Sequence, residues 1–459
     1  MSSNITDMSV GSPSKHLLKF SFPLLIGNIF QQFYNMVDSI VVGNFVGPNA
    51  IAAVGTCGSM NFFCFSLSSG LAIGIGIIIA QYFGAKDDKN VRKTIANSIY
   101  VLGFATIIIS ILGFCICPFV LKLLNCPENI LPDAVIYMRT TCCGIVFVVL
   151  YNGVASILRA LGDSKSPLYF LILSSIINLV LDLIFVIVFK WAVFGVAIAT
   201  VIAQAISGIV SLIYAYRKID YFKLTKKELK PNFHIIISSF KLSIPIALQN
   251  CLISVSMMVL QGVVNTFGEK VMASYTIVMR IEQLVQQPFS SLGTAITTFS
   301  GQNLGAKKIE RVKQGYHRGI LISFIFFVFI FVVFQLLSKY IVGFFVKDDE
   351  VIRIGSIGLR ITSCFYFSLA MIYVPRSVLN GCGDTSFAMI NGATEVVGRI
   401  VFANILTKIS SITLFGHIIP IGYWGIWLTT AITWTLTAIV CIIRYKSGIW
   451  FKKSVVLQK

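Results

Sequence analysis

The sequence predicts an all-α integral membrane protein of twelve transmembrane helices, arranged as two six-helix halves of one repeat. Three observations support this. Of the 459 residues, 56% are hydrophobic and only 12% are charged, where soluble domains carry roughly 25% charged residues. Apolar runs recur from Leu17 to Ile443, and twelve spans of about 20 residues need only roughly 240 residues. The two halves also align with each other at an almost constant spacing.

Apolar length, proline and glycine positions and charged breaks place the helices in order. The first six are expected near residues 17–42, 50–82, 94–118, 132–158, 167–189 and 193–216. The second six are expected near residues 235–264, 271–300, 316–345, 351–378, 386–407 and 420–444. The expected organisation is a first lobe over 1–216, a cytoplasmic connector over 217–234, a second lobe over 235–446 and a cytoplasmic tail over 447–459. The first run lacks a small-residue cleavage site, so we interpret it as a retained helix.

The charge of the chain indicates its orientation. Lys and Arg number 37 against 18 Asp and Glu, a net charge of +19. In a membrane protein such an excess marks the cytoplasmic loops. The loops and tails expected inside carry 26 Lys and Arg, and those expected outside carry seven. We therefore expect a multi-pass plasma membrane protein with both termini cytoplasmic, and we expect no nucleic-acid partner because no solvated domain carries the basic charge.

A repeat relates the two halves of the chain. The segment Gln81, Gly84, Ala85 and Lys86 matches Gln302, Gly305, Ala306 and Lys307 at a spacing of 221. Gly162 and Asp163 match Gly383 and Asp384 at the same spacing. Because six helices separate equivalent points, the halves share one orientation, which predicts a pseudo-twofold axis along the membrane normal, as in many transporters.

Four acidic residues fall inside the apolar runs: Asp38, Asp182, Glu282 and Glu395. An acid at the centre of a span costs a few kcal/mol even on insertion scales, so each should face a cavity, a partner or an ion. Asp38 lies late in the first helix, and Asp182 lies about 15 residues into the fifth, or roughly 22 Å from its inner end. Both therefore belong to the outer half of the membrane.

Neutral oxygens accompany these two aspartates at the same depth. Asn178 precedes Asp182 by four residues and shares its helix face, while Thr200 and Tyr137 lie just below the outer ends of their helices. Such a group can coordinate Na⁺ or share a proton. The alternative is that each aspartate only hydrogen-bonds a neighbouring helix.

The second lobe offers fewer signals. Glu395 and Arg399 are spaced for an internal ion pair. Glu282 does not face Arg280 on a helix, and with Gln32 and Met257 it is a candidate for the lining of a substrate cavity. Arg139 and Arg360 lie near helix ends, where snorkelling is the simpler interpretation.

The sequence contains no signature of catalysis. The four histidines are scattered, the 11 cysteines form no C-x-x-C pair, and there is no nucleophile elbow or P-loop. We expect no enzyme activity and no cofactor apart from a coupling ion. An integral membrane acyltransferase would need His and acid clustered at one interface, and a receptor or scaffold would leave the buried acids unexplained.

With these residues in view, the chain resembles the multidrug and toxic compound extrusion (MATE) transporters, in particular the bacterial multidrug branch, over nearly its whole length. The segments that carry the resemblance are PLLIGNIFQQFYNMVDSIVVGNFVG (23–47), AQYFGAKD (80–87), LRALGDSKSP (158–167), INLVLDLIF (177–185), GVAIAT (195–200) and NGATEVVGR (391–399). The resemblance implies two lobes in a V around a central cavity. It also implies export of organic, often cationic compounds in exchange for Na⁺ or H⁺ by alternating access.

By similarity, the first-lobe cation site consists of Asp38, Asn178, Asp182, Thr200 and Tyr137, and the first four are candidate Na⁺ ligands. One feature departs from the family: some members carry a functional Glu in the seventh helix, whereas residues 249–264 here contain no acid. We expect small organic substrates, a coupling cation and a monomer in the bilayer. The alternative within the superfamily is a flippase for lipid-linked precursors, which predicts a cavity lined by Arg and Lys.

Overall fold

The computed structural model describes residues 4–123, 126–409, 411–414, 417–420 and 422–455. Its first half contains α1 (Pro13–Phe45), α2 (Pro48–Gly84), α3 (Asp88–Leu123), α4 (Leu131–Ala160), α5 (Lys165–Leu183) and α6 (Ala192–Lys218). Its second half contains α7 (Phe233–Val264), α8 (Glu269–Gly305), α9 (Ile309–Gly343), α10 (Asp349–Ser363), α11 (Tyr366–Gly381), α12 (Ser386–Leu406) and α13 (Gly425–Lys446). The antiparallel strands β1 (Ser411–Leu414) and β2 (His417–Pro420) lie between α12 and α13.

Most of the expected helices are present with ends shifted by up to seven residues, and two of them differ in the structure that they form. The helix expected at 351–378 is two helices, α10 and α11, bent by 47°. At the break, the hydroxyl of Ser363 and the thiol of Cys364 both donate to the carbonyl of Arg360 (2.8 and 3.2 Å), and such local bonds compete with the backbone ladder. The helix expected at 420–444 begins later, at Gly425, because a strand and a 3₁₀ turn (Gly422–Trp424) precede it.

The all-helical membrane fold is confirmed, although hydropathy alone undercounts its spans. Within the described residues, nine helices are long and apolar enough to cross a membrane, or ten if α10 and α11 form one broken span. Helices α1 and α8 have comparable lengths but carry polar side chains, and the amide of Asn28 on α1 donates to the hydroxyl of Ser291 on α8 (3.1 Å). Because these polar groups meet each other and not lipid, both helices can belong to the bundle, which brings the described helical segments to twelve.

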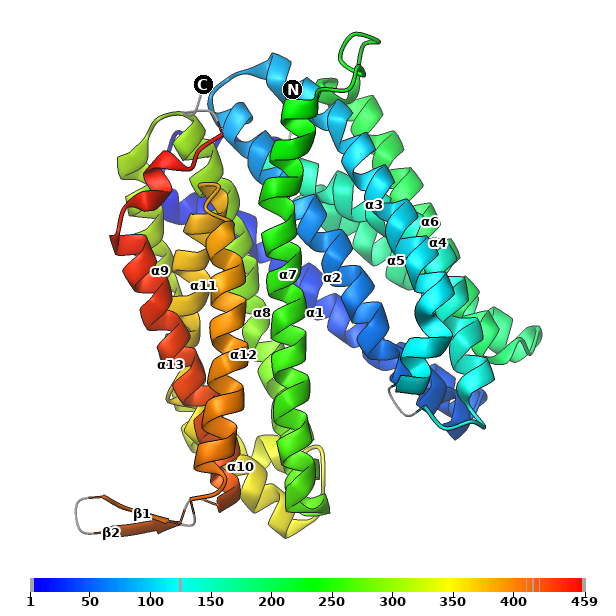
Figure 1. Cartoon of the computed structure of the whole chain (residues 1–459), viewed down its shortest axis with the longest axis vertical. Helices are drawn as coiled ribbons and strands as arrows, with labels where there is room; N and C mark the ends of the chain where they lie inside the picture. The colour runs from blue at the N-terminus through cyan, green and yellow to red at the C-terminus, as the bar shows by residue number, and fades with distance from the viewer. Residues whose placement is uncertain (1–3, 124–125, 410, 415–416, 421, 456–459) are drawn as a thin grey trace.

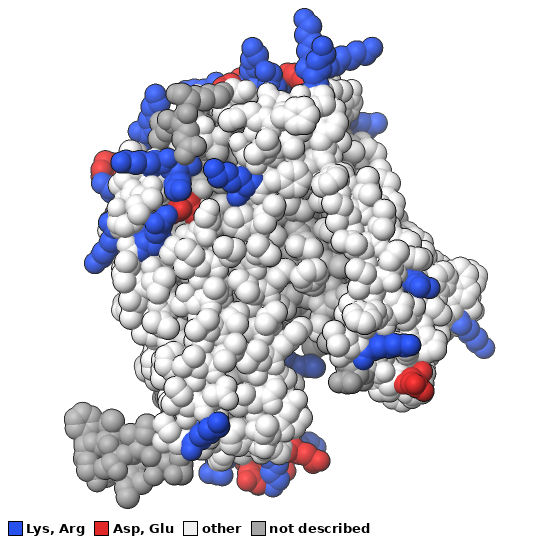
Figure 2. All heavy atoms as spheres, viewed as in Figure 1, with Lys and Arg blue, Asp and Glu red and all other residues white. Residues whose placement is uncertain are grey.

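The two halves form lobes that meet along their first two helices. Helix α1 packs against α8 and α9, and α2 packs against α7 and α8, while α3 also touches α7. Helices α3 to α6 lie on one side and α9 to α13 on the other (Figure 1). Both termini lie at one end of the molecule, which we call the terminal end. The lobes diverge toward the opposite, open end, where the space-filling view is hollowed between them (Figure 2).

The repeat is visible in the backbone. Lys86 and Lys307 both adopt a positive φ, of 57° and 60°, and Gly162 and Gly383 adopt φ of 87° and 90°. Non-glycine residues rarely occupy this region. Equivalent loops at the terminal end therefore share the same turn geometry.

The apolar core is divided mainly between the lobes, with contributions across the junction in both directions. Two clusters of buried residues fill the first lobe, one toward each end, and one of them also includes Leu242, Ile246 and Ala388 from the second lobe. A third fills the second lobe, and it includes Met8, Leu17 and Phe20 from the N-terminal segment and the first turns of α1. The beginning of α1 is therefore anchored in the second lobe.

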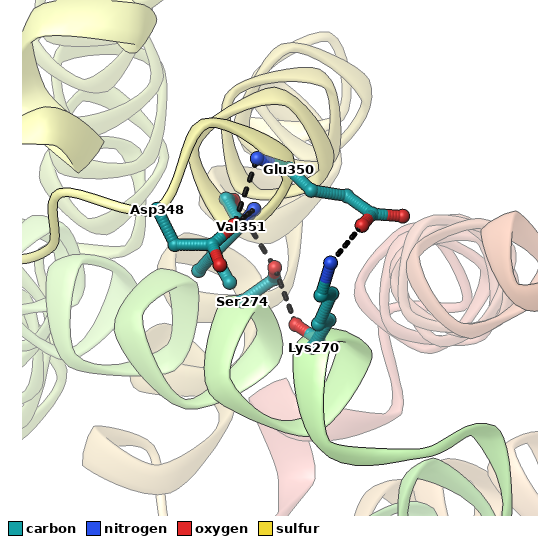
Figure 3. A network of polar contacts seen from close by, with 5 residues as sticks. All are labelled: Lys270, Ser274, Asp348, Glu350 and Val351. Atoms are coloured by element: carbon teal, nitrogen blue, oxygen red, sulfur yellow. Dashed lines mark hydrogen bonds and ion pairs between the residues drawn. The ribbon is translucent and has the colours of Figure 1, made fainter.

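At the open end, a polar network joins α8 to α10 (Figure 3). The carboxylate of Asp348 caps α10 by accepting from the backbone N–H groups of Glu350 and Val351 (2.9 and 3.1 Å). The Val351 N–H, followed by that of Glu350, lowers the pKa of Asp348 below its ordinary value. Lys270 pairs with Glu350, and the hydroxyl of Ser274 donates to the carbonyl of Val351 (3.1 Å).

The segments outside the lobes are ordered by local contacts. The connector expected at 217–234 contains the end of α6, a 3₁₀ turn (Asp220–Phe222) and the start of α7. Of the tail expected at 447–459, residues 456–459 lie outside the described residues. The described part forms a 3₁₀ turn (Ile449–Lys452) in which Trp450 is only 1% exposed. This part of the tail is packed against the protein.

Candidate functional site

The first-lobe residues singled out in the sequence come together where α1, α4, α5 and α6 meet. Helix α5 packs against both α1 and α6, and α6 packs against α4. Asp182 is the second-last residue of α5, and a π-helical turn (Ile184–Val188) follows it directly. Single π turns within helices are frequent at functional sites. The helix geometry thus changes beside the buried acid.

Asp38 and Asp182 face each other across the junction of α1 and α5. Asp182 is fully buried. Its carboxyl group lies close enough to that of Asp38 for the two to interact, and they can share a hydrogen bond when one of them is protonated. Neither oxygen of Asp182 has a hydrogen-bond partner among the described residues, and neither does Oδ1 of Asp38. The alternative that each aspartate only bonds a neighbouring helix does not account for these free oxygens.

Asn178 and Thr200 add neutral oxygens beside the carboxyl groups. The amide nitrogen of Asn178 donates to the Thr200 hydroxyl (3.5 Å), and that hydroxyl donates to the carbonyl of Val196 (3.1 Å). The amide oxygen of Asn178 is buried and has no partner in the described chain. Tyr137 is 7% exposed and lies close enough to Asp38 and Asp182 to interact with both. All five predicted residues therefore belong to one cluster.

Sequence reasoning missed two members of this cluster. Tyr34 lies near Asp38, Asp182 and Tyr137, and its hydroxyl is close to the side chain of Thr200. Asn61 of α2 interacts with Tyr137. The position of Tyr34 was detectable, because it precedes Asp38 by four residues and so shares its helix face. Nothing in the local sequence of Asn61 indicates its role, since it comes from another helix.

The charge of the cluster is not balanced by the protein. The ion pairs among the described residues are Lys223–Asp220, Lys270–Glu350, Lys313–Glu310 and Arg444–Asp384, and none involves Asp38 or Asp182. Buried carboxyl groups without a basic partner or a donor are costly. In the same part of the chain, no group of three or more His, Cys, Asp or Glu could hold a metal ion.

The second-lobe candidates are placed differently. Glu282 is 3% exposed and interacts with Thr362 and Arg399, so in this conformation it lies in the packed interior of the lobe. Glu395 and Arg399 are also buried, but no ion pair within 4 Å joins them, contrary to the expected pairing.

Arg399 instead donates to the sulfur of Met257, because α7 packs closely against α12 at this level (2.6 Å). Met257 and Gln32 are half-buried. The guanidinium therefore contacts one of the residues that we expected to line the substrate cavity.

Two glutamines of the repeat join the lobes at the terminal end. The amide of Gln81 on α2 donates to the carbonyl of Gly381 on α11 (3.0 Å), and the amide of Gln302 on α8 donates to the carbonyl of Ala160 on α4 (2.9 Å). Both glutamines are fully buried. The two bonds are equivalent in the repeat, since their donors and their acceptors are each 221 positions apart.

The chain termini complete this junction. The side-chain oxygen of Gln302 accepts the backbone N–H of Met8 (2.8 Å), and that of Gln81 accepts the N–H of Val455 (2.9 Å). Both ends of the described chain thus hold the lobes together at the terminal end.

Close backbone approach at this junction requires glycine. A Cβ added to Gly84 would lie 1.9 Å from the carbonyl oxygen of Gln302, and one added to Gly305 would lie 1.9 Å from that of Gln81. No side chain fits there. The G-A-K segments of the repeat are therefore contacts between the lobes.

Comparison with known proteins agrees with this architecture. The family model MatE matches residues 23–184 and 245–405. The chain is 27% identical to "Probable multidrug resistance protein YpnP" of Bacillus subtilis strain 168, with 97% of both chains covered. It is 23% identical to "Multidrug export protein MepA" of Staphylococcus saprophyticus, with 92% of this chain and 90% of the relative covered.

A solved structure described as the "outward-facing conformation of a multidrug resistance MATE family transporter of the MOP superfamily" has the same fold. It matches with a TM-score of 0.89 and 24% identity, covering 99% of this chain and 100% of that chain. At this level of identity the likeness establishes the fold alone.

Proposed function

The chain belongs to the MatE family of membrane transporters, and from this premise we propose that it exports organic, cationic compounds across the plasma membrane in exchange for Na⁺ or H⁺. The relatives named for multidrug resistance and multidrug export support the class of substrate. The exchange mechanism rests on the first-lobe cluster. The basic terminal end is cytoplasmic in this proposal, as the distribution of Lys and Arg predicts.

One observation supports the proposal most directly: the first-lobe cluster contains four buried oxygens that accept no hydrogen bond from the residues that the structure describes. They are Oδ1 of Asp38, both carboxylate oxygens of Asp182 and the amide oxygen of Asn178. Buried acceptors normally have partners. A cation that enters this cluster would supply the missing interactions, and its departure would restore the uncompensated charge.

Asp38, Asn178, Asp182 and Thr200 would hold Na⁺ through hard oxygen ligands. With H⁺ as the coupling ion, the two aspartates would share the proton instead. Tyr34 and Tyr137 would hydrogen-bond whichever form is present. Coupling requires that the cation bind one arrangement of the lobes more tightly than the other, because equal affinity shifts no population.

The arrangement of the lobes fits a state open to the outside. The glutamine bonds and the two terminal segments close the terminal end, while the lobes diverge at the other end. In this state the space between the lobes would release substrate outward and admit the coupling cation. Alternating access would then require the terminal junction to separate.

Efflux from proteoliposomes under separately imposed Na⁺ and H⁺ gradients tests the proposal. We expect Asp182→Asn to abolish gradient-driven efflux of a cationic dye while the protein remains monodisperse, because one ionisable oxygen of the cluster is lost. Asp133→Asn removes an exposed acid of the same lobe and should leave efflux unchanged. Full efflux by Asp182→Asn, or efflux that depends on neither gradient, would contradict the proposal.

A further inference from the structure

A groove between the lobes plays no part in the transport mechanism proposed above. It has a volume of about 580 Å³ and lies between α1, α8 and α9, near the terminal end. Its walls are mainly apolar and include Phe22, Pro23, Pro288, Leu292, Ile322 and Phe326. Because α1 begins in the first lobe's sequence but packs on α8 and α9, this groove follows the seam between the lobes.

Two lysines stand at the mouth of the groove. Lys19 of α1 and Lys165 of α5 line the groove and also line a smaller pocket of about 60 Å³, which the N-terminal segment forms with the start of α1 and the loop before α5. Both lysines are exposed, and neither forms an ion pair with an acid in the described chain. The groove and the pocket therefore meet at two lysines that are not ion-paired in the described chain.

The nearby acid Asp163 forms no ion pair with either lysine. Asp163 accepts from the backbone N–H groups of Lys165 and Ser166 (3.0 Å each) and from the Ser166 hydroxyl (2.6 Å). Its carboxylate is thus occupied by the first turn of α5. The smaller pocket is otherwise lined by neutral polar groups, by His16 and by the apolar side chains of Met8 and Phe20.

The groove also contains an unsatisfied donor. The hydroxyl of Ser323 on α9 lies in its wall, is 2% exposed and has no hydrogen-bond partner among the described residues. Buried hydroxyl groups normally find one. An ester or ether oxygen on a chain lying in the groove would accept this hydrogen bond.

We propose that the groove binds one anionic phospholipid of the inner leaflet, with an acyl chain between α1, α8 and α9 and its phosphate at Lys19 and Lys165. The apolar walls fit the chain, and the two lysines favour a negative headgroup and disfavour a cationic amphiphile. The basic terminal end would face the leaflet that carries anionic lipids. Because the site includes parts of both lobes, a bound lipid stabilises the arrangement closed at the terminal end.

Native mass spectrometry of the purified full chain tests the site. Delipidated protein is titrated with phosphatidylglycerol, with phosphatidylcholine of the same acyl chains, and with inorganic phosphate. We expect one tightly bound phosphatidylglycerol and much weaker binding of phosphatidylcholine. The double variant Lys19→Gln with Lys165→Gln should lower the affinity for phosphatidylglycerol about 25-fold. Each lysine near an anionic lipid contributes about fivefold to this affinity.

Two further variants make the result specific. Lys226→Gln with Lys227→Gln removes two exposed lysines of the connector and should leave the affinity unchanged. Ile322→Trp fills the groove without altering its charge, and it should lower the affinity for both phospholipids. This variant also tests the site if the double lysine variant does not fold. Equal affinity for the two lipids, no effect of the lysine variant, or competition by phosphate at the affinity of the lipid would overturn the proposal. The last outcome would indicate an adventitious anion only.

Discussion

At the scale of single residues, the first-lobe cluster is defined by what its side chains lack. Among the described residues, Asp182 has no partner for either oxygen, and Asn178 has one for its nitrogen but none for its oxygen. The free groups are all acceptors, which is the arrangement that a cation requires. An ordinary buried polar network would alternate donors and acceptors until all were satisfied.

Tyr34→Phe tests whether the hydroxyl missed by sequence reasoning belongs to the cluster. The Tyr34 hydroxyl lies near the neutral hydroxyl of Thr200, and a hydrogen bond between neutral groups is worth about 1 kcal/mol, so we expect the coupling cation to bind about fivefold more weakly. The concentration of Na⁺ or H⁺ that gives half-maximal efflux measures this change. Tyr100→Phe, which alters a hydroxyl bonded to Leu229 at the surface, is the control, and equal behaviour of the two variants would remove Tyr34 from the site.

Asp348→Ala tests whether the contribution of the Asp348 helix cap to stability depends on pH. A carboxyl group with a lowered pKa contributes stability above its ordinary pKa of about 3.9, and this stability is lost as the pH falls through the lowered value. We therefore expect Asp348→Ala to lower the thermal unfolding temperature at pH 7 and to have little effect near pH 3. Differential scanning fluorimetry of the variant and the unmodified protein at both pH values measures the change in unfolding temperature. Asp349→Ala, one position beyond the cap, should show no such difference, and a loss of similar size at both pH values would refute the assignment.

At the scale of secondary structure, the elements near the lobe junction depend on special backbone contacts. Helices α2 and α8 end at Gly84 and Gly305, and each of these glycines lies against the backbone of the opposite helix. The following turns contain Lys86 and Lys307 in the left-handed region. The ends of α2 and α8 therefore act as matched contact surfaces.

Gly84→Leu should force the terminal end apart. Its Cβ alone would overlap the carbonyl oxygen of Gln302, so the closed arrangement becomes inaccessible without movement of α8. We expect the distance distribution between spin labels at Lys89 and Gln314 to lengthen. That between labels at Glu128 and Glu269, on the open end, should shorten.

These labels require a background without the exposed thiols of Cys115, Cys143 and Cys364. Gly103→Leu is the matched control, because a Cβ added there meets no heavy atom within 4 Å. Unchanged distances in Gly84→Leu would show that the lobes do not separate at this junction.

At the scale of the whole molecule, the lobes make reciprocal contacts because they are copies of one another. Helix α1 packs on α8 and α9, as α7 packs on α2 and α3. Gln81 and Gln302 bond each other's lobes in the same way. Two copies related by an axis along the membrane normal can close at either end by the same kind of motion, which is what alternating access requires.

Thiol labelling tests the orientation of the molecule. We expect a membrane-impermeant maleimide to label Glu128→Cys on intact cells and to label Lys89→Cys only after the membrane is permeabilised, because loops rich in Lys and Arg remain inside. Both positions are exposed. The background again lacks the exposed cysteines. The reverse pattern would place the terminal end outside and would also reverse the leaflet of the proposed lipid.

The sequence by itself determined the class of fold, the repeat and the approximate positions of most helices, and it predicted five residues of the first-lobe cluster. These features depend on hydropathy, on a constant spacing of 221 residues and on acids whose burial in a span demands an explanation. Such signals are local or periodic, and so they can be detected in one dimension.

The tertiary structure alone decided which side chains meet. It brought Asn61 to Tyr137, turned Arg399 toward Met257 instead of Glu395, and bonded Gln81 to Gly381. It also placed the two lysines of α1 and α5 at the mouth of one groove. Each of these contacts joins different helices, and their rotation and depth are set by packing across the whole bundle, which no single stretch of sequence encodes.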